Sequence, residues 1–410
     1  MSEWKECKLG DVAGVYNGYS FKSGEYHSFH PGHLEVLKMG HIEPGGGLRK
    51  LPKKDYMPRE SRFEKYILKK NDIVLAMTDM KDSMGILGHP AIIDLDDHYV
   101  LNQRVARIIV QDHKNIDFTF LFYQMRSTDF ISELQSRAHS GVQVNLTTSA
   151  IKDARILLPQ LPEQRAIAGV LSSLDDKIDL LHRQNKTLEG MAEALWRKMF
   201  VPACAGEPHA DREEADPGWK KGKLGDIAEI NPLRSIKKEA ITTYLDMSNM
   251  PTDGPFPKEW VQRDYSSGMK FKNGDTVIAR ITPCLENGKT AYVNFLNNEE
   301  IAWGSTEYII LAPKTGYSSE WYYFLARNDD FRDFAIQNMT GTSGRQRVSG
   351  DSIAQYEIAI PPMNITERFR TFAGPVMDHI KHNSFQIRTL IRLRDTLIPK
   401  LMSGEVRVKL

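Results

Sequence analysis

The sequence predicts an α+β protein built as a pseudo-twofold tandem repeat, with two similar globular domains and two long coiled-coil helices. Three observations carry this prediction: a set of landmark motifs occurs twice, strand-like runs alternate with Gly/Pro turns, and a long heptad pattern ends each copy. From Asp72 onward the copies lie 201 to 203 residues apart. Repeats of this length are duplicated domains, because solenoid units recur roughly every 20–50 residues.

Four landmark motifs occur in both copies and in the same order. They are KLGD at 8–11 and 223–226, NDIVLA at 71–76 and GDTVIA at 274–279, SGVQ at 140–143 and SGRQ at 343–346, and ILLP at 156–159 and IAIP at 358–361. A molecule with two similar halves has two similar surfaces, so we expect it to contact its target twice.

The composition is that of an ordinary globular protein. With 41% hydrophobic and 26% charged residues the chain is neither disordered nor membranous, and no apolar run approaches the roughly 18 residues of a spanning helix. The start resembles no signal peptide, so we expect a cytoplasmic protein. Three widely spaced cysteines, Cys7, Cys204 and Cys284, predict neither a disulfide framework nor a cysteine zinc site.

Charge gives a weaker indication of the partner. The net charge of +1 means that any nucleic-acid surface must be a local patch. Residues 49–70 offer one candidate, with nine Lys and Arg against three acidic residues. A solvated surface of mixed charge explains the same segment equally well.

Changes of pattern divide the chain into five segments. They are a first domain over 1–158, a spacer helix over 159–200, a linker over 201–218, a second domain over 219–360, and a distal spacer helix with the C-terminal tail over 361–410. In the first domain, strand-like runs at 73–77, 91–94 and 105–110 precede one helix over 118–134, whose copy covers 320–334. Both domains are therefore expected to be compact α+β units.

Apolar residues spaced alternately by three and four predict the two coiled-coil helices. The first seam is Leu171, Leu174, Ile178, Leu181, Asn185, Leu188, Ala192, Leu195 and Met199, and the second is Ala373, Val376, Ile380, Asn383, Ile387, Leu390, Arg394, Leu397 and Leu401. We expect the two helices to pair with each other. Asn185 and Asn383 interrupt the seams, as polar residues that fix register do. Pro399 predicts that the second helix ends or kinks near Ile398.

No catalytic constellation is present in the sequence. It contains no dinucleotide or phosphate loop, no zinc-protease motif and no serine nucleophile elbow. His27, His30 and His33 are spaced by three within a Gly/Pro loop, and this pattern is too weak to predict a metal site. The sequence therefore favours a binding protein that is not itself an enzyme.

Two polar segments at equivalent places of the copies have the chemistry of base recognition. Asn and Gln can bond an adenine edge, Arg can bond guanine, and Ser or Gly lets the backbone approach phosphate. The candidate DNA-binding residues are Ser140, Gln143 and Asn145 in the first copy and Ser343, Arg345, Gln346 and Arg347 in the second. A polar turn before the last strand of each domain is the alternative.

Several motifs together resemble one protein family over nearly the whole chain. They are NGYSFKS at 17–23, GDTVIARITPCLENGK at 274–289, STE at 305–307 and LPQLPEQR at 158–165. With these motifs the chain resembles the specificity subunits of type I restriction-modification systems. The second copy departs from the pattern, because MNITER at 363–368 replaces the PEQ helix opening.

The resemblance implies two target-recognition domains, each of which reads half of an asymmetric, interrupted DNA site. Two antiparallel helices would hold them apart and dock two modification subunits, which carry S-adenosylmethionine and methylate adenine N6; restriction translocase subunits would join them. No cofactor or metal is then expected in this chain. A self-contained DNA methyltransferase and a coiled-coil scaffold without a nucleic-acid role remain as alternatives. The first lacks its motifs here, and the second gives no reason for two elaborate domains.

Overall fold

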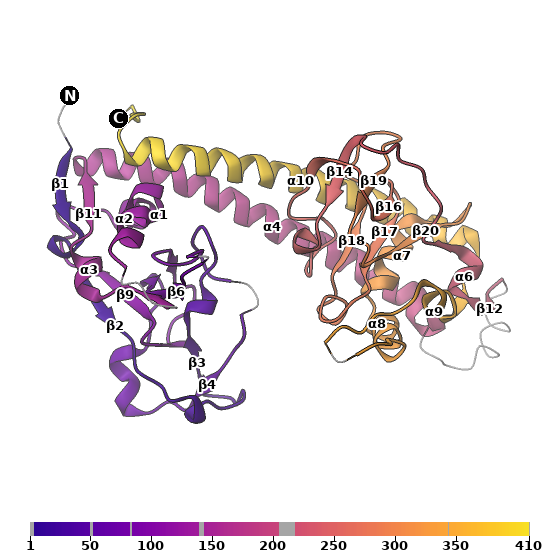
Figure 1. Cartoon of the computed structure of the whole chain (residues 1–410), viewed down its shortest axis with the longest axis horizontal. Coiled ribbons are helices and arrows are strands. Elements are labelled where there is room, and N and C mark those ends of the chain that lie inside the picture. The colour runs from indigo at the N-terminus through magenta and orange to yellow at the C-terminus, as the bar shows by residue number, and fades with distance from the viewer. Residues whose placement is uncertain are drawn as a thin grey trace. The chain divides into compact units, whose positions relative to one another are not determined.

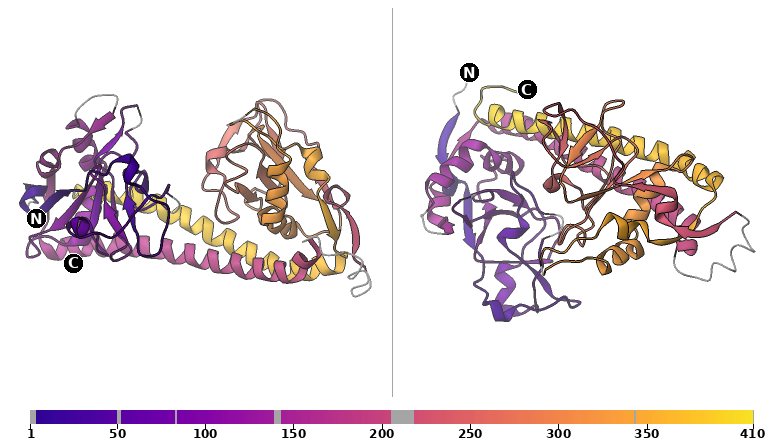
Figure 2. Two further views of the ribbon diagram at one scale, coloured as in Figure 1. Left: turned by 90° about the horizontal axis from the view of Figure 1, so that it is seen from below. Right: turned by 45° about the vertical axis from the view of Figure 1, so that its right-hand side comes forward.

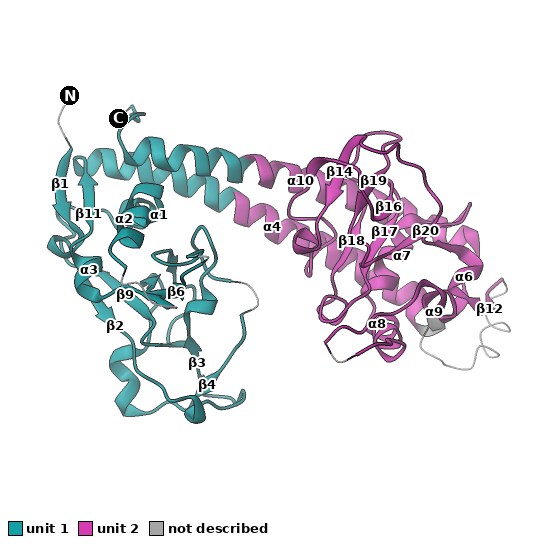
Figure 3. Ribbon diagram, in the orientation of Figure 1, with its two compact units in different colours: residues 1–177, 390–410 teal, residues 178–389 magenta. Residues whose placement is uncertain are grey.

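The computed structural model describes residues 4–49, 52–82, 84–138, 143–204, 218–342 and 344–409. The chain divides into two compact units (Figure 3): unit 1 comprises residues 1–177 and 390–410, and unit 2 comprises residues 178–389. Each unit contains a globular domain and a stretch of both long helices. Most of the predicted linker, residues 205–217, lies outside the described residues.

Unit 1 contains a four-stranded antiparallel sheet in the order β2-β9-β5-β7, a three-stranded sheet β4-β3-β8, and two ribbons, β1-β11 and β6-β10 (Figure 1). Its elements are β1 (Lys5–Lys8), β2 (Ala13–Asn17), β3 (Leu34–Leu37), β4 (Tyr56–Met57), β5 (Ile73–Ala76), β6 (Thr78–Met80), β7 (Pro90–Ile92), β8 (Tyr99–Leu101), β9 (Val105–Val110), α1 (Phe118–Arg126), α2 (Thr128–Ser136), β10 (Gln143–Asn145), α3 (Thr148–Lys152), β11 (Arg155–Leu158) and the start of α4 (Leu161–Cys204).

Unit 2 repeats this arrangement, with a four-stranded sheet β13-β20-β17-β18, a second sheet β15-β14-β19-β16 and the ribbon β12-β21. Its elements are β12 (Lys220–Lys223), α6 (Leu224–Ile227), β13 (Ala228–Ile230), β14 (Ile241–Leu245), β15 (Val261–Asp264), β16 (Met269–Phe271), β17 (Thr276–Ala279), β18 (Thr290–Tyr292), β19 (Ala302–Gly304), β20 (Tyr308–Pro313), α7 (Ser319–Arg327), α8 (Asp329–Gln337), α9 (Gly350–Ala354), β21 (Glu357–Ile360) and most of α10 (Met363–Met402). The predicted fold class, a duplicated α+β protein, is confirmed.

Strand β5 shows why the landmark NDIVLA is apolar without alternation. Successive side chains of a strand point to opposite faces of the sheet. Ile73 and Leu75 pack in the core that α1 and the long helices cover, whereas Val74 and Ala76 pack in a second core toward β3 and β8. Both faces of the strand are buried, which accounts for its unbroken run of apolar side chains.

The single helices predicted over 118–134 and 320–334 are wrong, because each is two helices. Ser127 separates α1 from α2, has extended backbone angles, and accepts the backbone N–H of Phe130 on its side chain. Asn328 breaks the second copy in the same way and caps α8. Ser and Asn are favoured caps because their short polar side chains replace a missing helical hydrogen bond. The apolar periodicity of the sequence continues through each break, so it predicted one helix in place of two.

The long helices pair as the seams predict, and within each unit they lie side by side (Figure 2). Every seam residue is buried or half-buried. In unit 2, Nδ2 of Asn383 donates to Oδ1 of Asn185 at 2.9 Å, and the rings of Phe200 and Phe369 lie 5.6 Å apart. Residue numbers fall along α10 as they rise along α4, so the helices are antiparallel.

The apolar face of the helices is wider than the strict seam. Trp196 and Phe200 are fully buried although neither belongs to it. These side chains pack against the globular domain of unit 2, in a core that also contains Trp321. A helix that covers a domain as well as a partner helix needs a broader stripe than a coiled coil does.

Of the end or kink predicted near Ile398, the end is wrong, because α10 continues to Met402. Pro399 lies in the last turn of the helix. Its missing N–H removes one intrahelical bond, but the backbone N–H of Ser403 still bonds the Pro399 carbonyl at 3.0 Å. A proline so close to the end interrupts few bonds, so the helix closes beyond it.

The PEQ opening of α4 joins three parts of unit 1. The buried Gln164 side chain accepts the N–H of Asp117 at 2.9 Å and donates to the carbonyls of Asn115 and Pro159, both at 2.8 Å. Nη1 of Arg407 donates to the two carboxylate oxygens of Glu163 at 2.6 and 2.8 Å. The motif therefore fixes the start of α4 against the loop before α1 and the C-terminal tail.

Candidate nucleic-acid interface

In unit 1 the candidate residues Gln143 and Asn145 lie on the β6-β10 ribbon, where Asn145 is opposite Thr78. The Thr78 hydroxyl donates to Oδ1 of Asn145 at 2.8 Å. Nδ2 of Asn145 donates to the Gln143 carbonyl at 3.4 Å. Thr78 is buried and Asn145 is exposed, so a fixed side chain holds the amide at the surface.

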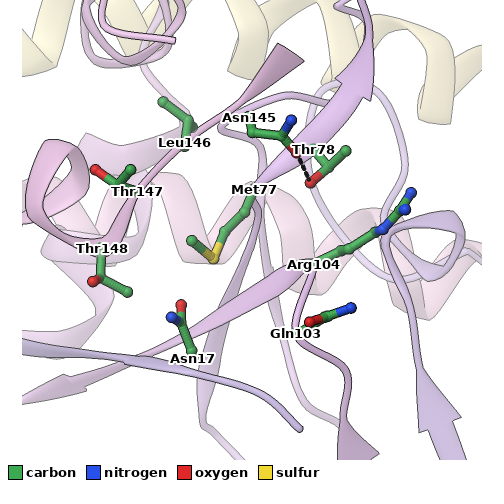
Figure 4. A pocket seen from close by; sticks show the side chains of 9 residues that line it. All are labelled: Asn17, Met77, Thr78, Gln103, Arg104, Asn145, Leu146, Thr147 and Thr148. Carbon is green, nitrogen blue, oxygen red and sulfur yellow. Dashed lines mark hydrogen bonds between the residues drawn. The ribbon is translucent and has the colours of Figure 1, made fainter. Parts of the chain in front are cut away.

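A pocket of about 370 Å³ opens beside this pair (Figure 4). Its lining is mostly polar and uncharged: Asn17, Met77, Thr78, Gln103, Arg104, Asn145, Leu146, Thr147 and Thr148. The side chain of Asn102 accepts the backbone N–H of Arg104 at 3.0 Å and so shapes the turn that carries Gln103 and Arg104. Amides, hydroxyls and one guanidinium are groups that bond base edges and phosphates.

Backbone hydrogen bonds locate the same turn in unit 2. The N–H of Met77 donates to the carbonyl of Arg104 at 3.0 Å, and the N–H of Arg280 donates to that of Glu307, also at 3.0 Å. Arg280 therefore corresponds to Met77, and Glu307 to Arg104. Ser305 accepts the N–H of Glu307 at 3.1 Å, as Asn102 does in unit 1.

The candidate residues Asn145 and Arg347 correspond by the same criterion. Leu146 donates its backbone N–H to Met77 at 2.8 Å, and Val348 donates its own to Arg280 at 3.0 Å. The residue before each of them is Asn145 in unit 1 and Arg347 in unit 2. These two side chains thus occupy one structural position in the two domains.

At this position unit 2 carries an ion cluster. Nε of Arg347 lies 2.9 Å from both carboxylate oxygens of Glu307, and Nη2 lies 2.7 Å from one of them. Arg280 donates from Nε to the same carboxylate at 3.2 Å. Hydrogen bonds from Arg347 and Arg280 outweigh the opposing effect of burial and hold the pKa of Glu307 below its usual value. Two arginines share one carboxylate, so the cluster keeps a positive charge.

The other predicted site residues have different surroundings. Arg345 is exposed, and its backbone carbonyl accepts Nη1 of Arg347 at 3.1 Å. Gln346 is half-buried, and its carbonyl accepts the N–H of Thr282 at 3.1 Å. Gln143 is half-buried beside Asn145. Ser140 and Ser343 lie outside the described residues.

Sequence reasoning missed the residues that complete both sites. In unit 1 these are Asn17, Thr78, Gln103 and Arg104; in unit 2 they are Arg280 and Glu307. A signal for some of them was present, because Asn17 begins the motif NGYSFKS and Glu307 ends the motif STE. Pairing these motifs with the later polar turns required the fold.

The basic segment over 49–70 is neutralised in part within unit 1. Four of its cations bind carboxylates: Lys54 with Glu35 at 2.9 Å, Arg59 with Glu64 at 3.3 Å, Arg62 with Glu60 at 2.8 Å and Lys69 with Asp97 at 2.6 Å. These pairs lower the positive charge of the segment without removing it, so both interpretations of the segment stay open.

The histidine loop brings three rings together without forming a metal site. The ring centroids of His27 and His33 lie 5.8 Å apart, and those of His30 and His33 lie 5.1 Å apart. Among the residues that the structure describes, no group of three His, Cys, Asp or Glu is arranged to hold a metal ion. Cys7 and Cys284 are free thiols. Within the same described ranges, no helix has the length and apolar character to cross a membrane.

A family comparison agrees with the duplicated geometry. The family described as "Type I restriction modification DNA specificity domain" matches this chain twice, over residues 1–190 and 217–372. The chain belongs to this family. Each match covers one globular domain and part of the helix that follows it, so the family unit corresponds to one copy of the repeat.

Related specificity subunits extend over much of the chain. The MjaIX specificity subunit of Methanocaldococcus jannaschii is 25% identical over 330 residues, which cover 75% of this chain and 73% of the relative. The HindI specificity subunit of Haemophilus influenzae is 21% identical over 485 aligned positions, covering 99% of this chain and 100% of the relative. The crystal structure of the type I S subunit from M. genitalium shares the fold, with a TM-score of 0.58, 15% identity and coverage of 97% and 96% of the two chains.

Proposed function

We propose that this specificity subunit reads an asymmetric, bipartite DNA target, with one half-site for each unit. The observation that carries the proposal is the pair of equivalent sites with unlike side chains. Unit 1 presents an open pocket rimmed by amides and hydroxyls, whereas unit 2 presents Arg280, Glu307 and Arg347. Two copies of one fold that present different side chains would recognise two different DNA sequences.

We infer that two copies of one modification subunit dock on the helices. What supports this inference is that exposed apolar side chains of the helices recur with the repeat. Unit 1 exposes Val170 and Leu393, and unit 2 exposes Phe372 and Met191. Val170 and Phe372 differ by 202 positions, as do Met191 and Leu393. The repeat thus relates the two pairs, as identical partners require.

In this proposal the modification subunits hold S-adenosylmethionine and methylate adenine N6, restriction translocase subunits complete the restricting complex, and this chain supplies only recognition. The test is incorporation of labelled methyl groups into DNA by the highly purified chain, with and without its modification subunit. We expect turnover only in the mixture. Turnover by the chain alone would identify it as a self-contained methyltransferase. A mixture that neither binds nor methylates DNA would favour a scaffold.

A further inference from the structure

In both units the side chain at the shared position is held by a neighbour on another strand or turn. Thr78 holds Asn145 in unit 1, and Glu307 holds Arg347 in unit 2. These partners lie 67 and 40 residues away in the sequence. A side chain fixed in this way loses little conformational freedom on binding, which improves discrimination between similar ligands.

The bonds that Arg347 already makes define what it can still donate. A guanidinium has five N–H groups. Nε and Nη2 bond Glu307, and Nη1 bonds the Arg345 carbonyl. Two N–H groups remain, one on each terminal nitrogen. Guanine presents two adjacent acceptors, O6 and N7, in the major groove, and this donor pair fits them.

Counting the unused hydrogen-bonding groups of Asn145 in the same way indicates a different base. Its Oδ1 accepts one hydrogen bond, from Thr78, and its Nδ2 donates one, to Gln143. An amide oxygen has two lone pairs and an amide nitrogen has two hydrogens, so one acceptor and one donor remain. Adenine presents a donor at N6 and an acceptor at N7, which is the complementary pair.

We propose that Arg347 reads a guanine in the half-site of unit 2, that Asn145 reads an adenine in the half-site of unit 1, and that Glu307 and Thr78 are their positioning residues. This inference rests on the proposed DNA-reading function and adds the base that each unit selects at one shared position.

Glu307 suits the role of a positioning residue. It is an acceptor only, so it bonds one side of the Arg347 guanidinium without competing for the acceptors of guanine. The second arginine, Arg280, leaves the cluster positive, and a positive cluster attracts the phosphate backbone where an isolated carboxylate would repel it. A carboxylate can also accept from cytosine N4, which makes direct reading by Glu307 the rival outcome.

The test uses the full chain in complex with its modification subunit. Methylation mapping with the wild-type chain first gives the target, and binding is then measured on single-base variants of both half-sites. We expect Arg347→Ala to lose roughly ten-fold or more of its preference for guanine at one base pair. Asn145→Ala should lose a comparable preference for adenine in the other half-site. Lys221→Ala, which removes a cation from an exposed ion pair with Glu357 in the same unit, is the matched control and should change neither.

Positioning is tested by Glu307→Gln and by Thr78→Val, which keep the shape of the side chain. Each should lower discrimination at the same base pair as its partner variant. In an Arg347→Ala background, Glu307→Gln should have no further effect on discrimination. A merely structural role would instead weaken binding to all sequences equally and leave the preference unchanged.

The outcomes distinguish a failure of the proposed function from a failure of the base assignments. If the wild-type complex recognises no bipartite site, the proposed function fails. If it recognises one and Arg347→Ala and Asn145→Ala keep the wild-type base preferences, only the present inference is overturned. A Glu307→Gln variant that changes preference at a cytosine, independently of Arg347, would show that Glu307 reads a base itself and would overturn its assignment as a positioning residue.

Discussion

The two units differ in the side chains that pack between the pair of long helices and the first short helix of the domain, which is α1 in unit 1 and α7 in unit 2. In unit 1, the carboxylate of Asp175 in α4 accepts three hydrogen bonds. The donors are the hydroxyl of Tyr123 at 2.7 Å, Nη1 of Arg126 at 3.1 Å and Nη1 of Arg394 at 2.7 Å. In unit 2 the repeat places Met377, Phe324, Arg327 and Ala192 at the corresponding positions. Met377, Phe324 and Ala192 are buried in one apolar core, and Arg327 bonds the carbonyl of Thr252 at 2.9 Å instead.

This difference teaches that the fold accepts, at the position of Asp175, either a carboxylate with its donors or an apolar side chain in an apolar core. An ion cluster and an apolar cluster of similar volume have similar stability when each is complete. Removing the shared carboxylate has a much larger effect, because it leaves the arginines with fewer partners in a poorly hydrated place.

The largest effect is therefore expected from Asp175→Ala. Arg126 and Arg394 are only 7% and 16% exposed, so Arg126 would lose its carboxylate partner in a buried setting and Arg394 would keep only the exposed Asp395. We expect a loss of about 3 kcal/mol or more of local stability in unit 1. Hydrogen exchange of the α1 backbone measures it. Asp395→Ala is the control: this partner of Arg394 is 55% exposed, so its loss should cost less than about 1 kcal/mol.

A smaller effect is expected when the residues of unit 2 are transplanted together. The variant Tyr123→Phe/Asp175→Met/Arg394→Ala gives unit 1 the apolar cluster, and Arg126 keeps its bond to the Gly45 carbonyl. We expect it to recover at least about 1 kcal/mol of the Asp175→Ala loss. An equal or greater loss in the triple variant would show that the charged cluster itself is needed.

The smallest effect is expected in how the stability of each unit depends on pH, which should differ between unit 1 and unit 2. Burial opposes ionisation of Asp175, but the charge of Arg126 and the bonds from Arg394 and Tyr123 keep its pKa below the usual value. The stability it adds is present above the unfolded pKa of about 3.9 and is lost as pH falls through the lower folded value.

Glu189 in unit 2 should behave in the opposite way. Burial raises its pKa despite the hydrogen bond from the Tyr323 hydroxyl. Stability linked to Glu189 is therefore present below the unfolded pKa of about 4.3 and is lost as pH rises through the raised folded value. Hydrogen exchange of each unit at several pH values checks both signs, and Glu189→Gln should remove the dependence at α7. The same sign in both units would contradict the assignment.

Much of the fold follows from the sequence, because local patterns determine it. The heptads predicted two paired helices, and the repeated landmarks predicted two copies of one domain. The breaks at Ser127 and Asn328 escaped prediction, because apolar periodicity continued across them and each depends on one capping bond.

The candidate site was predicted only in part. Composition indicated Asn145 and Arg347, but not that they share one position or which neighbours hold them. Those neighbours approach through β6 and through the turn before β20, far away in the sequence, so no local pattern could reveal them. The counter-charges Glu35 and Asp97 of the basic segment at 49–70 also lie outside it, so its composition alone did not reveal them.

The central claim is that the two units read DNA independently. The most direct test replaces residues 219–358 with the corresponding domain of another specificity subunit and maps adenine methylation in cells that also contain the modification subunit. Unit 1 keeps its pocket and Asn145, so we expect one half of the target to change and the other half to stay the same. A target that changes in both halves, or in neither, would contradict independent reading.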